Sequence, residues 1–311
     1  MRHIVAAIAA AICVLAMTAT VTGCSGSAPQ RAQTTAKHSG ARHPAARRAH
    51  TGPRYYLALG DSLARGVQPT PAGASLSSEN GYADRLYAAL RPGMPGLRLV
   101  KLGCSGETSY TMVHGGICQY PVGSQLAQAD AFLRAHRRHM ALVTIDIGAN
   151  DPNSCFIGAP LSKVASCMTS RVKLTLADLR TILHDLRSAG GRHLKIIGMS
   201  YYVPELAGWL DGMRGKEVAV LTERLVAGYN SLLIRTYHRY HAAVAGVFSA
   251  FHSSDFSDQV NLPGIGKVPR NVATVCKLTW ACTRPPRGPN EHANSLGYAI
   301  IALAFLLADK S

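Results

Sequence analysis

Acidic residues are scarce in this sequence: 17 Asp and Glu stand against 33 Lys and Arg, which leaves a formal net charge of +16 at pH 7. Such a basic chain is suited to anionic partners. No nucleic-acid-binding module is recognisable, so we do not expect nucleic acid to be that partner. The excess charge therefore indicates an anionic surface, and the alternative is that it only aids solubility.

Long apolar runs are also rare, because only one occurs, from Ile4 to about Val21. It follows a short basic start and ends in small residues before Cys24, which is the layout of an export signal. The cysteine predicts a bacterial lipoprotein signal at 1–23, with Cys24 as the lipidated residue. The alternative is ordinary cleavage with an incidental cysteine. We therefore expect an exported protein, either anchored at the cell surface through Cys24 or secreted.

Large apolar side chains are few in residues 24–53, where Ser, Ala, Thr, Pro, His and Arg predominate. A segment of this composition cannot bury enough apolar surface to fold, so we expect a disordered basic tether. One domain at 54–311 remains. On an exported chain the positive charge favours contact with an anionic membrane or cell-wall surface. We expect the protein to be a monomer.

The cysteines include no C-x-x-C pair and no clustered Cys/His spacing, which argues against a metal site. Six cysteines remain beyond residue 24, and an even number in an exported domain predicts disulfides. Many connectivities are possible. We favour pairing between sequence neighbours, because each pair closes a short loop. The expected disulfides are Cys104–Cys118, Cys155–Cys167 and Cys276–Cys282.

After residue 54, short apolar runs alternate with helical patterns. The expected strands are 55–59, 97–102, 141–147, 194–199 and 243–248, and the expected helices are 82–90, 125–137, 161–188, 217–240 and 294–307. This alternation predicts a parallel sheet covered on both faces. The last helix has Leu296, Ile300 and Leu303 on one apolar stripe. Residues 255–270 are polar and rich in Gly and Pro, so we expect a long loop there.

Four polar segments lie where catalytic groups collect in an open α/β sheet. They are 60–62, 102–108 and 147–151, each after an expected strand, and 288–292, before the last helix. Acyl transfer needs a nucleophile, a base and oxyanion donors. Ser62 is the candidate nucleophile and His292 the candidate base. The backbone N–H groups of Ser62 and Gly106 and the side-chain amide of Asn150 are candidate donors.

Each of these residues also has an ordinary structural explanation. Ser62 could cap the next helix, Asn150 could be a turn residue, and His292 could simply begin a helix. We expect Asp61 to be structural, binding nearby backbone. The combination of four ordered segments favours catalysis over four separate coincidences.

The four segments resemble the conserved blocks of the SGNH, or GDSL, hydrolase superfamily, including its secreted actinobacterial-type esterases with three disulfides. The resemblance runs from Arg54 to the C-terminus. It implies a three-layer α/β/α sandwich with a five-stranded parallel sheet, similar to flavodoxin, and ester hydrolysis through an acyl-serine without a cofactor. It places the nucleophile on Ser62, the base on His292 and the oxyanion hole on Ser62, Gly106 and Asn150. The G-x-S-x-G elbow of the rival α/β-hydrolases is absent.

One position departs from the family pattern. The family usually has an aspartate three residues before the histidine, and Pro289 stands there in this sequence. Glu291 is adjacent to His292, so its side chain is expected to point away from the imidazole. We therefore expect the backbone carbonyl of Pro289 to accept the Nδ1–H of His292, which makes the site a Ser–His dyad.

The sequence thus predicts a secreted serine esterase or lipase that acts on fatty-acyl or lipid esters. Apolar residues in the connecting loops favour such substrates if they line an acyl pocket, although they could equally cover the sheet: Tyr110, Met112, Tyr201, Tyr202, Trp209 and Leu210. One alternative is a carbohydrate O-acetyl esterase of the cell envelope. The other is a non-catalytic surface-binding lipoprotein on the same scaffold.

Overall fold

The computed structural model describes residues 52–155 and 161–310. The predicted signal at 1–23, the lipidation site Cys24 and nearly all of the predicted tether at 24–53 lie outside these described residues. The domain is built on a five-stranded sheet in the order β4-β1-β5-β6-β7. The strands are β1 (Arg54–Gly60), β4 (Leu97–Lys101), β5 (Met140–Asp146), β6 (Ile196–Met199) and β7 (Ala243–Ala245). Every neighbouring pair is parallel, which confirms the predicted parallel sheet.

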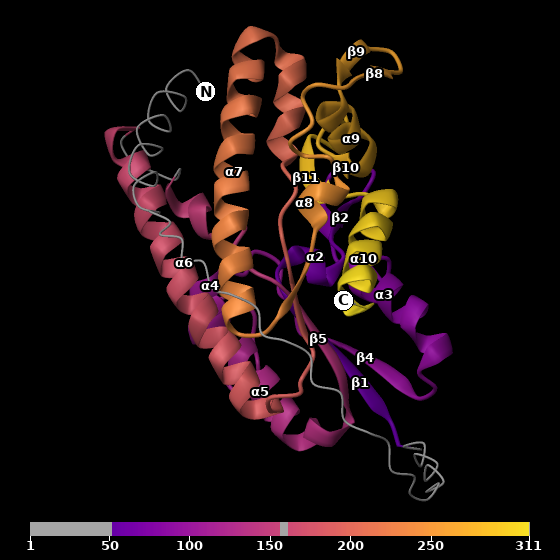
Figure 1. Cartoon of the computed structure of the whole chain (residues 1–311). Helices are drawn as coiled ribbons and strands as arrows, with labels where there is room; N and C mark the ends of the chain where they lie inside the picture. Colours follow the sequence, from indigo (N-terminus) through magenta and orange to yellow (C-terminus); the bar gives the residue numbers. More distant parts are fainter. Residues whose placement is uncertain (1–51, 156–160, 311) are drawn as a thin grey trace, which may run out of the picture.

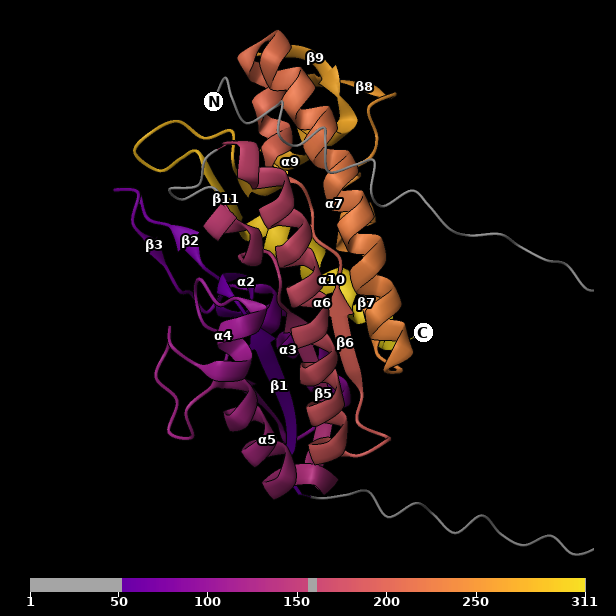
Figure 2. The ribbon, with the colours of Figure 1, turned by 90° about the vertical axis from the view of Figure 1, so that its left-hand side faces the viewer.

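Helices cover both faces of the sheet and make the predicted three-layer sandwich (Figures 1 and 2). One layer contains α3 (Tyr82–Leu90) and α10 (Ser295–Lys310). The opposite layer contains α4 (Ser109–His114), α5 (Gln125–His136), α6 (Leu161–Gly190) and α7 (Met213–Arg239). Tyr82 stacks on Phe305 with ring centroids 4.6 Å apart, which joins α3 to α10.

Small elements connect the layers, most of them after the carboxyl ends of the strands. They are α2 (Ser62–Arg65), η2 (Arg91–Gly93), η3 (Arg137–His139), η4 (Asp151–Cys155), η5 (Pro204–Asp211), α8 (Val247–Ala250) and α9 (Arg270–Leu278). Two short antiparallel pairs accompany them: β2 (Gln68–Pro69) with β3 (Ser75–Leu76), and β10 (Thr279–Trp280) with β11 (Asn290–Ala293).

The central strands are apolar on both faces because helices cover both faces. Leu57 and Leu59 in β1 and Leu142 and Ile145 in β5 have no exposed surface. Burying one such side chain contributes about 1.5–3 kcal/mol relative to leaving it in water. The near-continuous apolar runs of the sequence are therefore explained by the sheet's central position.

Two expectations about local structure were wrong. Residues 255–270 are not only a loop, since they contain a hairpin of β8 (Gln259–Leu262) and β9 (Gly266–Pro269). Its strands are largely exposed and pair through backbone groups, so no apolar pattern marked them. The stripe of Leu296 and Leu303 is also about half exposed, at 45% and 49%. Helix α10 is apolar on nearly all sides, and its periodicity therefore did not indicate which face packs on the sheet.

The three predicted disulfides are present: Cys104–Cys118, Cys155–Cys167 and Cys276–Cys282. Each closes a loop of 14 residues or fewer by sequence separation. Among the helices of the described residues, none combines the length and apolar character needed to cross a bilayer.

Candidate active site

The turn that carries Ser62 is built by the close approach of two strands. Strand β1 ends at Gly60, whose φ is +130°. A Cβ at this position would lie 2.1 Å from the carbonyl oxygen of Asp146 at the end of β5, so only glycine fits. The Asp61 carboxylate accepts the Leu63 N–H at 2.9 Å and caps α2. Asp61 is therefore the capping residue, as its expected structural role requires, and Ser62 does not serve as the cap.

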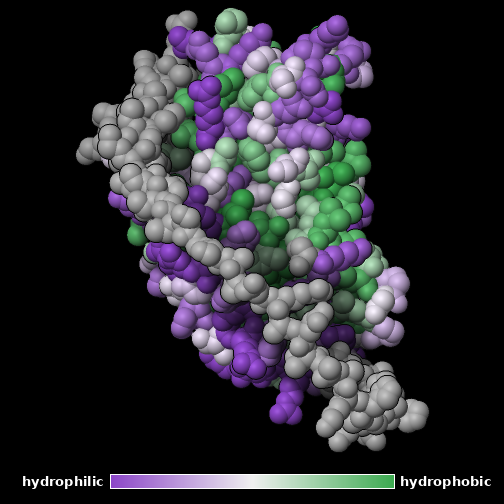
Figure 3. Space-filling model, in the orientation of Figure 1, coloured by the Kyte–Doolittle hydropathy of each residue, from purple (hydrophilic) through white to green (hydrophobic). Residues whose placement is uncertain are grey.

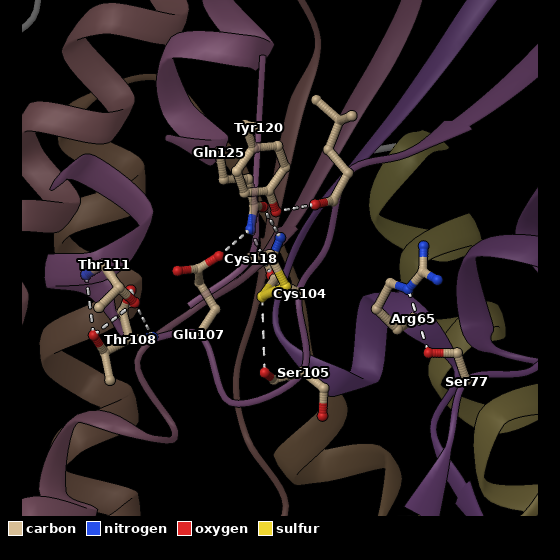
Figure 4. The surroundings of a disulfide bond; sticks show 12 residues. Arg65, Ser77, Cys104, Ser105, Glu107, Thr108, Thr111, Cys118, Tyr120 and Gln125 are labelled. Atoms are coloured by element: carbon tan, nitrogen blue, oxygen red, sulfur yellow. Dashed lines mark hydrogen bonds between the residues drawn. A yellow bond between two sulfur atoms is a disulfide. The ribbon is translucent and has the colours of Figure 1, made fainter. Parts of the chain in front are cut away.

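A second segment, the oxyanion loop at 102–108, lies after β4. Gly106 in this loop is exposed and has φ +81°, in the region that favours glycine. Glu107 beside it is buried, and its carboxylate accepts a hydrogen bond from Gln125 Nε2 at 2.9 Å. Figure 4 shows this bond next to the Cys104–Cys118 disulfide, which closes the same loop.

Asn150 brings the nucleophile turn and the oxyanion loop together. Its Nδ2 donates to the Glu107 carbonyl at 3.0 Å and lies 3.5 Å from Asp61 Oδ2. Asn150 follows the carboxyl end of β5, and the two acceptors follow β4 and β1. Three of the four predicted segments therefore meet at one edge of the sheet, as parallel strands require.

The next residue fixes the same region from the other side. Asp151 is buried, and its Oδ2 accepts the Ser109 N–H at the start of α4 at 3.0 Å. The Ser109 hydroxyl also contacts the Asp151 carboxylate and donates to Asp178 Oδ2 at 3.0 Å. These bonds tie the segment after β5 to the helix that follows the oxyanion loop.

His292 lies in β11 with only 7% of its surface exposed. Its Nδ1 is 2.8 Å from Asn290 Oδ1, and the same oxygen accepts the His292 backbone N–H at 3.0 Å. An amide oxygen can only accept, so Nδ1 carries the proton and Nε2 is left as the basic nitrogen. The Pro289 carbonyl was thus the wrong acceptor, because the adjacent side chain reaches Nδ1 instead.

The position of Glu291 also differs from the expectation. Its Oε1 lies 3.5 Å from His292 Nδ1, although two thirds of the Glu291 side chain (68%) is exposed. Burial lowers the pKa of the His292 imidazole, and the Glu291 charge partly offsets this effect. Burial prevails because the carboxylate is largely in water, where its attraction is weakened. A neutral imidazole, the form that can act as a base, is the result.

Hydrogen bonds of two buried tyrosines join the C-terminal segment to the rest of the site. Tyr202, after β6, donates to the Glu291 carbonyl at 2.8 Å. Tyr298 in α10 donates to the Val67 carbonyl at 2.8 Å, and the Val67 N–H donates to the Ser62 carbonyl at 3.0 Å. The histidine segment is therefore connected to the nucleophile turn through the residues that follow each of them.

Two buried polar residues at this site were missed by the sequence analysis. Asp146, at the end of β5, has no exposed surface; it accepts the Tyr82 hydroxyl, and its Oδ2 accepts the Ala64 N–H at 3.2 Å. An acid inside an otherwise apolar strand was the signal available for it. Gln125, at the start of α5, is fully buried too, and no local pattern distinguished it from a surface glutamine.

Asp61 and Asp146 form a buried carboxyl pair beneath the nucleophile. Burial raises the pKa of Asp61 to about 6. Burial and the neighbouring Asp61 charge raise the pKa of Asp146 further. Since two carboxylates this close cannot both ionise, Asp146 holds a proton and donates it to Asp61.

Three of the residues considered for an acyl pocket belong to the core instead. Met112, Tyr201 and Tyr202 are 7% exposed or less, and Tyr110 is exposed at 57%. Trp209, in η5, does line a groove of about 390 Å³ together with Met213, Lys216, Glu217, Val220, Leu221 and Arg224. Within residues 52–155 and 161–310, no three acidic, histidine or cysteine side chains are grouped as metal ligands.

Comparison with known proteins gives matches at the level of family and of fold. Residues 58–300 match the GDSL-like Lipase/Acylhydrolase family. The structure is similar to an extracellular lipase from Streptomyces rimosus, with TM-score 0.52 and 16% identity over 82% of this chain and 99% of that chain. It is also similar to an acetylxylan esterase from Geobacillus stearothermophilus, with TM-score 0.50 and 19% identity over 83% and 94%. Curated proteins gave no match.

Proposed function

This chain belongs to the GDSL-like Lipase/Acylhydrolase family and is a carboxylic ester hydrolase, and we propose that its nucleophile is Ser62. The observation that carries the proposal is the position of Asn150. Its amide lies against both Asp61, beside the nucleophile, and Glu107, beside Gly106. Donors to an oxyanion must converge beside the attacking oxygen, and these segments do converge.

In the proposed reaction, Nε2 of His292 removes the Ser62 proton as the hydroxyl attacks the ester carbonyl. Asn290 Oδ1 holds the imidazole in the required tautomer. The Ser62 and Gly106 N–H groups and the Asn150 amide stabilise the tetrahedral oxyanion. The same imidazole then protonates the leaving alcohol and activates water, which releases the acid and regenerates Ser62.

A fluorophosphonate probe tests the nucleophile directly. We expect a covalent adduct on Ser62 in the wild type and none in Ser62→Ala, with ester hydrolysis lost in parallel. Ser105→Ala removes an exposed hydroxyl from the oxyanion loop and is the matched control, which should still be labelled. Unchanged labelling and turnover in Ser62→Ala would show that another residue is the nucleophile.

For the substrate, we propose fatty-acyl or lipid esters as the first class. The groove beside η5 supports it, because Trp209, Met213, Val220 and Leu221 give it apolar walls beyond the carboxyl ends of the strands. A carbohydrate O-acetyl ester is the second class. The burial of Met112, Tyr201 and Tyr202 supports this class, because they are not available to a long acyl chain.

A series of p-nitrophenyl esters from acetyl to palmitoyl separates the two substrate classes. Preference for long chains, reduced by Trp209→Ala, would support the lipid ester. A sharp preference for acetyl, unaffected by that substitution, would support the O-acetyl ester. Leu296→Ala, at an exposed apolar position on α10, is the control for a general loss of apolar surface.

For the location, we propose residues 1–23 as a lipoprotein signal, 24–53 as a tether and 54–311 as the catalytic domain at the cell surface. Three disulfides support export, because they persist in oxidising compartments. Metabolic labelling with a radioactive fatty acid should mark the wild type but not Cys24→Ser. Equal labelling of both would contradict the proposed anchor.

A further inference from the structure

Exposed arginines precede or begin every strand of the central sheet. We define the cationic edge as these residues: Arg54 at the start of β1, Arg91 before β4, Arg137 and Arg138 before β5, Arg192 before β6 and Arg239 before β7. Because all five strands are parallel, their amino ends lie along one side of the sheet. The six guanidinium groups therefore occupy one end of the domain.

These charges are not neutralised by neighbouring acids. Among the residues that the structure describes, none of the six guanidinium groups lies within 4 Å of a carboxylate. The nearby acid Asp309 is already paired with Lys195 at 2.9 Å. In Figure 3 the lower end of the domain, where α5 and α6 end, is mostly hydrophilic.

The surface that carries the arginines is well defined. Arg187, in α6, donates to the carbonyls of Tyr240 at 3.0 Å and His241 at 2.6 Å, and also bonds the Leu194 carbonyl. These bonds join the segments before β6 and β7. The charges on either side are thereby presented from one rigid end of the domain.

The chain also enters the domain at this edge. Gly52, the first described residue, lies beside His139 in η3, since a Cβ on Gly52 would be 3.4 Å from the imidazole Cε1. Any anchor further towards the N-terminus therefore connects to the domain here. The proposed lipid at Cys24 would hold the cationic edge, and no other end of the domain, nearest to the membrane.

We propose that the cationic edge docks on a bilayer surface rich in anionic phospholipid. A row of separate arginines across one end of a sheet suits mobile lipid head groups, whereas a linear polymer is held better by a groove. One acyl chain alone gives only marginal membrane binding, and a basic surface supplies the second attraction. This inference deepens the proposed surface location and rests on it for the role of Cys24.

Docking in this orientation constrains the substrate. Ser62 and Asn150 follow the carboxyl ends of β1 and β5, whereas the cationic edge lies at the amino ends. A strand of seven residues such as β1 spans on the order of 20 Å. The active site then faces away from the supporting bilayer, so esters on glycans beyond the membrane are in reach and esters within that bilayer are not.

Vesicle binding tests the docking surface. The full chain, with Cys24→Ser in every sample to prevent lipidation, is mixed with phosphatidylcholine vesicles with or without equimolar phosphatidylglycerol and sedimented. The variant R137Q/R138Q/R192Q should bind the anionic vesicles at least tenfold less well, since each arginine contributes about fivefold. R214Q/R224Q/R284Q removes the same charge from exposed arginines elsewhere and should lose less than threefold.

The alternatives give different results. Equal losses in the two triple variants, or no preference for anionic vesicles, would overturn the proposal. Tighter binding to soluble polyglycerol phosphate than to the vesicles would overturn it in favour of a wall polymer. Quenching of a fluorophosphonate dye on Ser62 by lipids with nitroxide head groups would contradict the orientation, whereas unquenched fluorescence on bound vesicles would support it.

Failure of this inference is distinguishable from failure of the proposed function. Labelling of Ser62 without selective vesicle binding would remove the docking surface and leave the ester hydrolase nucleophile. Selective binding through the cationic edge without labelling would remove Ser62 as the nucleophile and leave the docking surface. Hydrolysis of soluble p-nitrophenyl acetate should be the same in both triple variants, because neither touches the active site.

Discussion

Gln125 holds both backbone polar groups of Gly60 at once. Its Oε1 accepts the Gly60 N–H at 2.6 Å, and its Nε2 donates to the Gly60 carbonyl at 3.0 Å. The same Nε2 donates to Glu107, in the loop of Gly106. A single side chain thus sets the distance between the turn that carries Ser62 and the loop that supplies an oxyanion donor.

Replacing Gln125 with leucine should therefore lower kcat by more than tenfold and leave KM within about threefold, since the oxyanion donors act mainly in the transition state. Loss of buried hydrogen bonds should also cost about 2–3 kcal/mol of unfolding free energy. Gln128→Leu is the control, because the buried Oε1 of Gln128 has no hydrogen-bond partner in the described part of the chain. Equal effects of both substitutions on kcat would contradict a positioning role for Gln125.

The orientation of His292 predicts a difference between its two neighbours. Asn290→Ala removes the acceptor of Nδ1–H and should lower kcat about ten- to a hundredfold. Glu291→Gln should retain most activity, since it removes only an exposed charge. It should also lower the pKa of His292 further and move the acid limb of kcat/KM to lower pH. If Glu291→Gln abolished turnover, Glu291 would be the group that orients the imidazole.

The buried carboxyl pair predicts a pH dependence of stability. Burial raises the pKa of Asp61 to about 6 and that of Asp146 further, so protonation favours the folded state. This contribution is complete below about pH 4, the range of an unfolded aspartate, and is lost as pH rises through about 6 and above. Wild-type Tm should therefore fall over this range more than it does in Asp146→Asn, whose amide imitates the protonated acid.

The expected difference in Tm change between the two proteins is several degrees. One unit of pKa shift is about 1.4 kcal/mol, and each kcal/mol moves the Tm of a domain of this size by about 2–4 °C. Thermal unfolding between pH 4 and pH 8 measures it, with the exposed Asp211→Asn as the control. A steeper pH dependence in Asp146→Asn than in the wild type would show that Asp146 is ionised in the folded protein.

The disulfide beside the oxyanion loop predicts a selective loss of activity. Cys104→Ala/Cys118→Ala opens a loop of 14 residues and should cost about 3 kcal/mol. Cys276→Ala/Cys282→Ala opens one of 6 residues and should cost about 2 kcal/mol. At a temperature where both variants remain folded, only the first should lower kcat, because Gly106 lies within its loop. A fall in kcat for the second variant alone would contradict this assignment.

Local patterns in the sequence were sufficient for the order of strands and helices, the three disulfides and the meeting of three polar segments. Apolar runs such as 142–147 mark strands buried on both faces, and parallel strands bring their following turns to one edge. Ser62, Gly106 and Asn150 could be found in this way because each lies next to the end of a strand.

Tertiary contacts decided what local patterns could not. Gln125 and Gly60 are 65 positions apart, and Asp146 and Asp61 are 85 apart, so no short-range periodicity relates them. The choice of Asn290 over the Pro289 carbonyl depended on how β11 packs around His292. Helix α10 is apolar on nearly every side, and only its contacts with α3 and the sheet show which residues are buried. In each case the deciding energy comes from burial and hydrogen bonding between segments that meet only after folding.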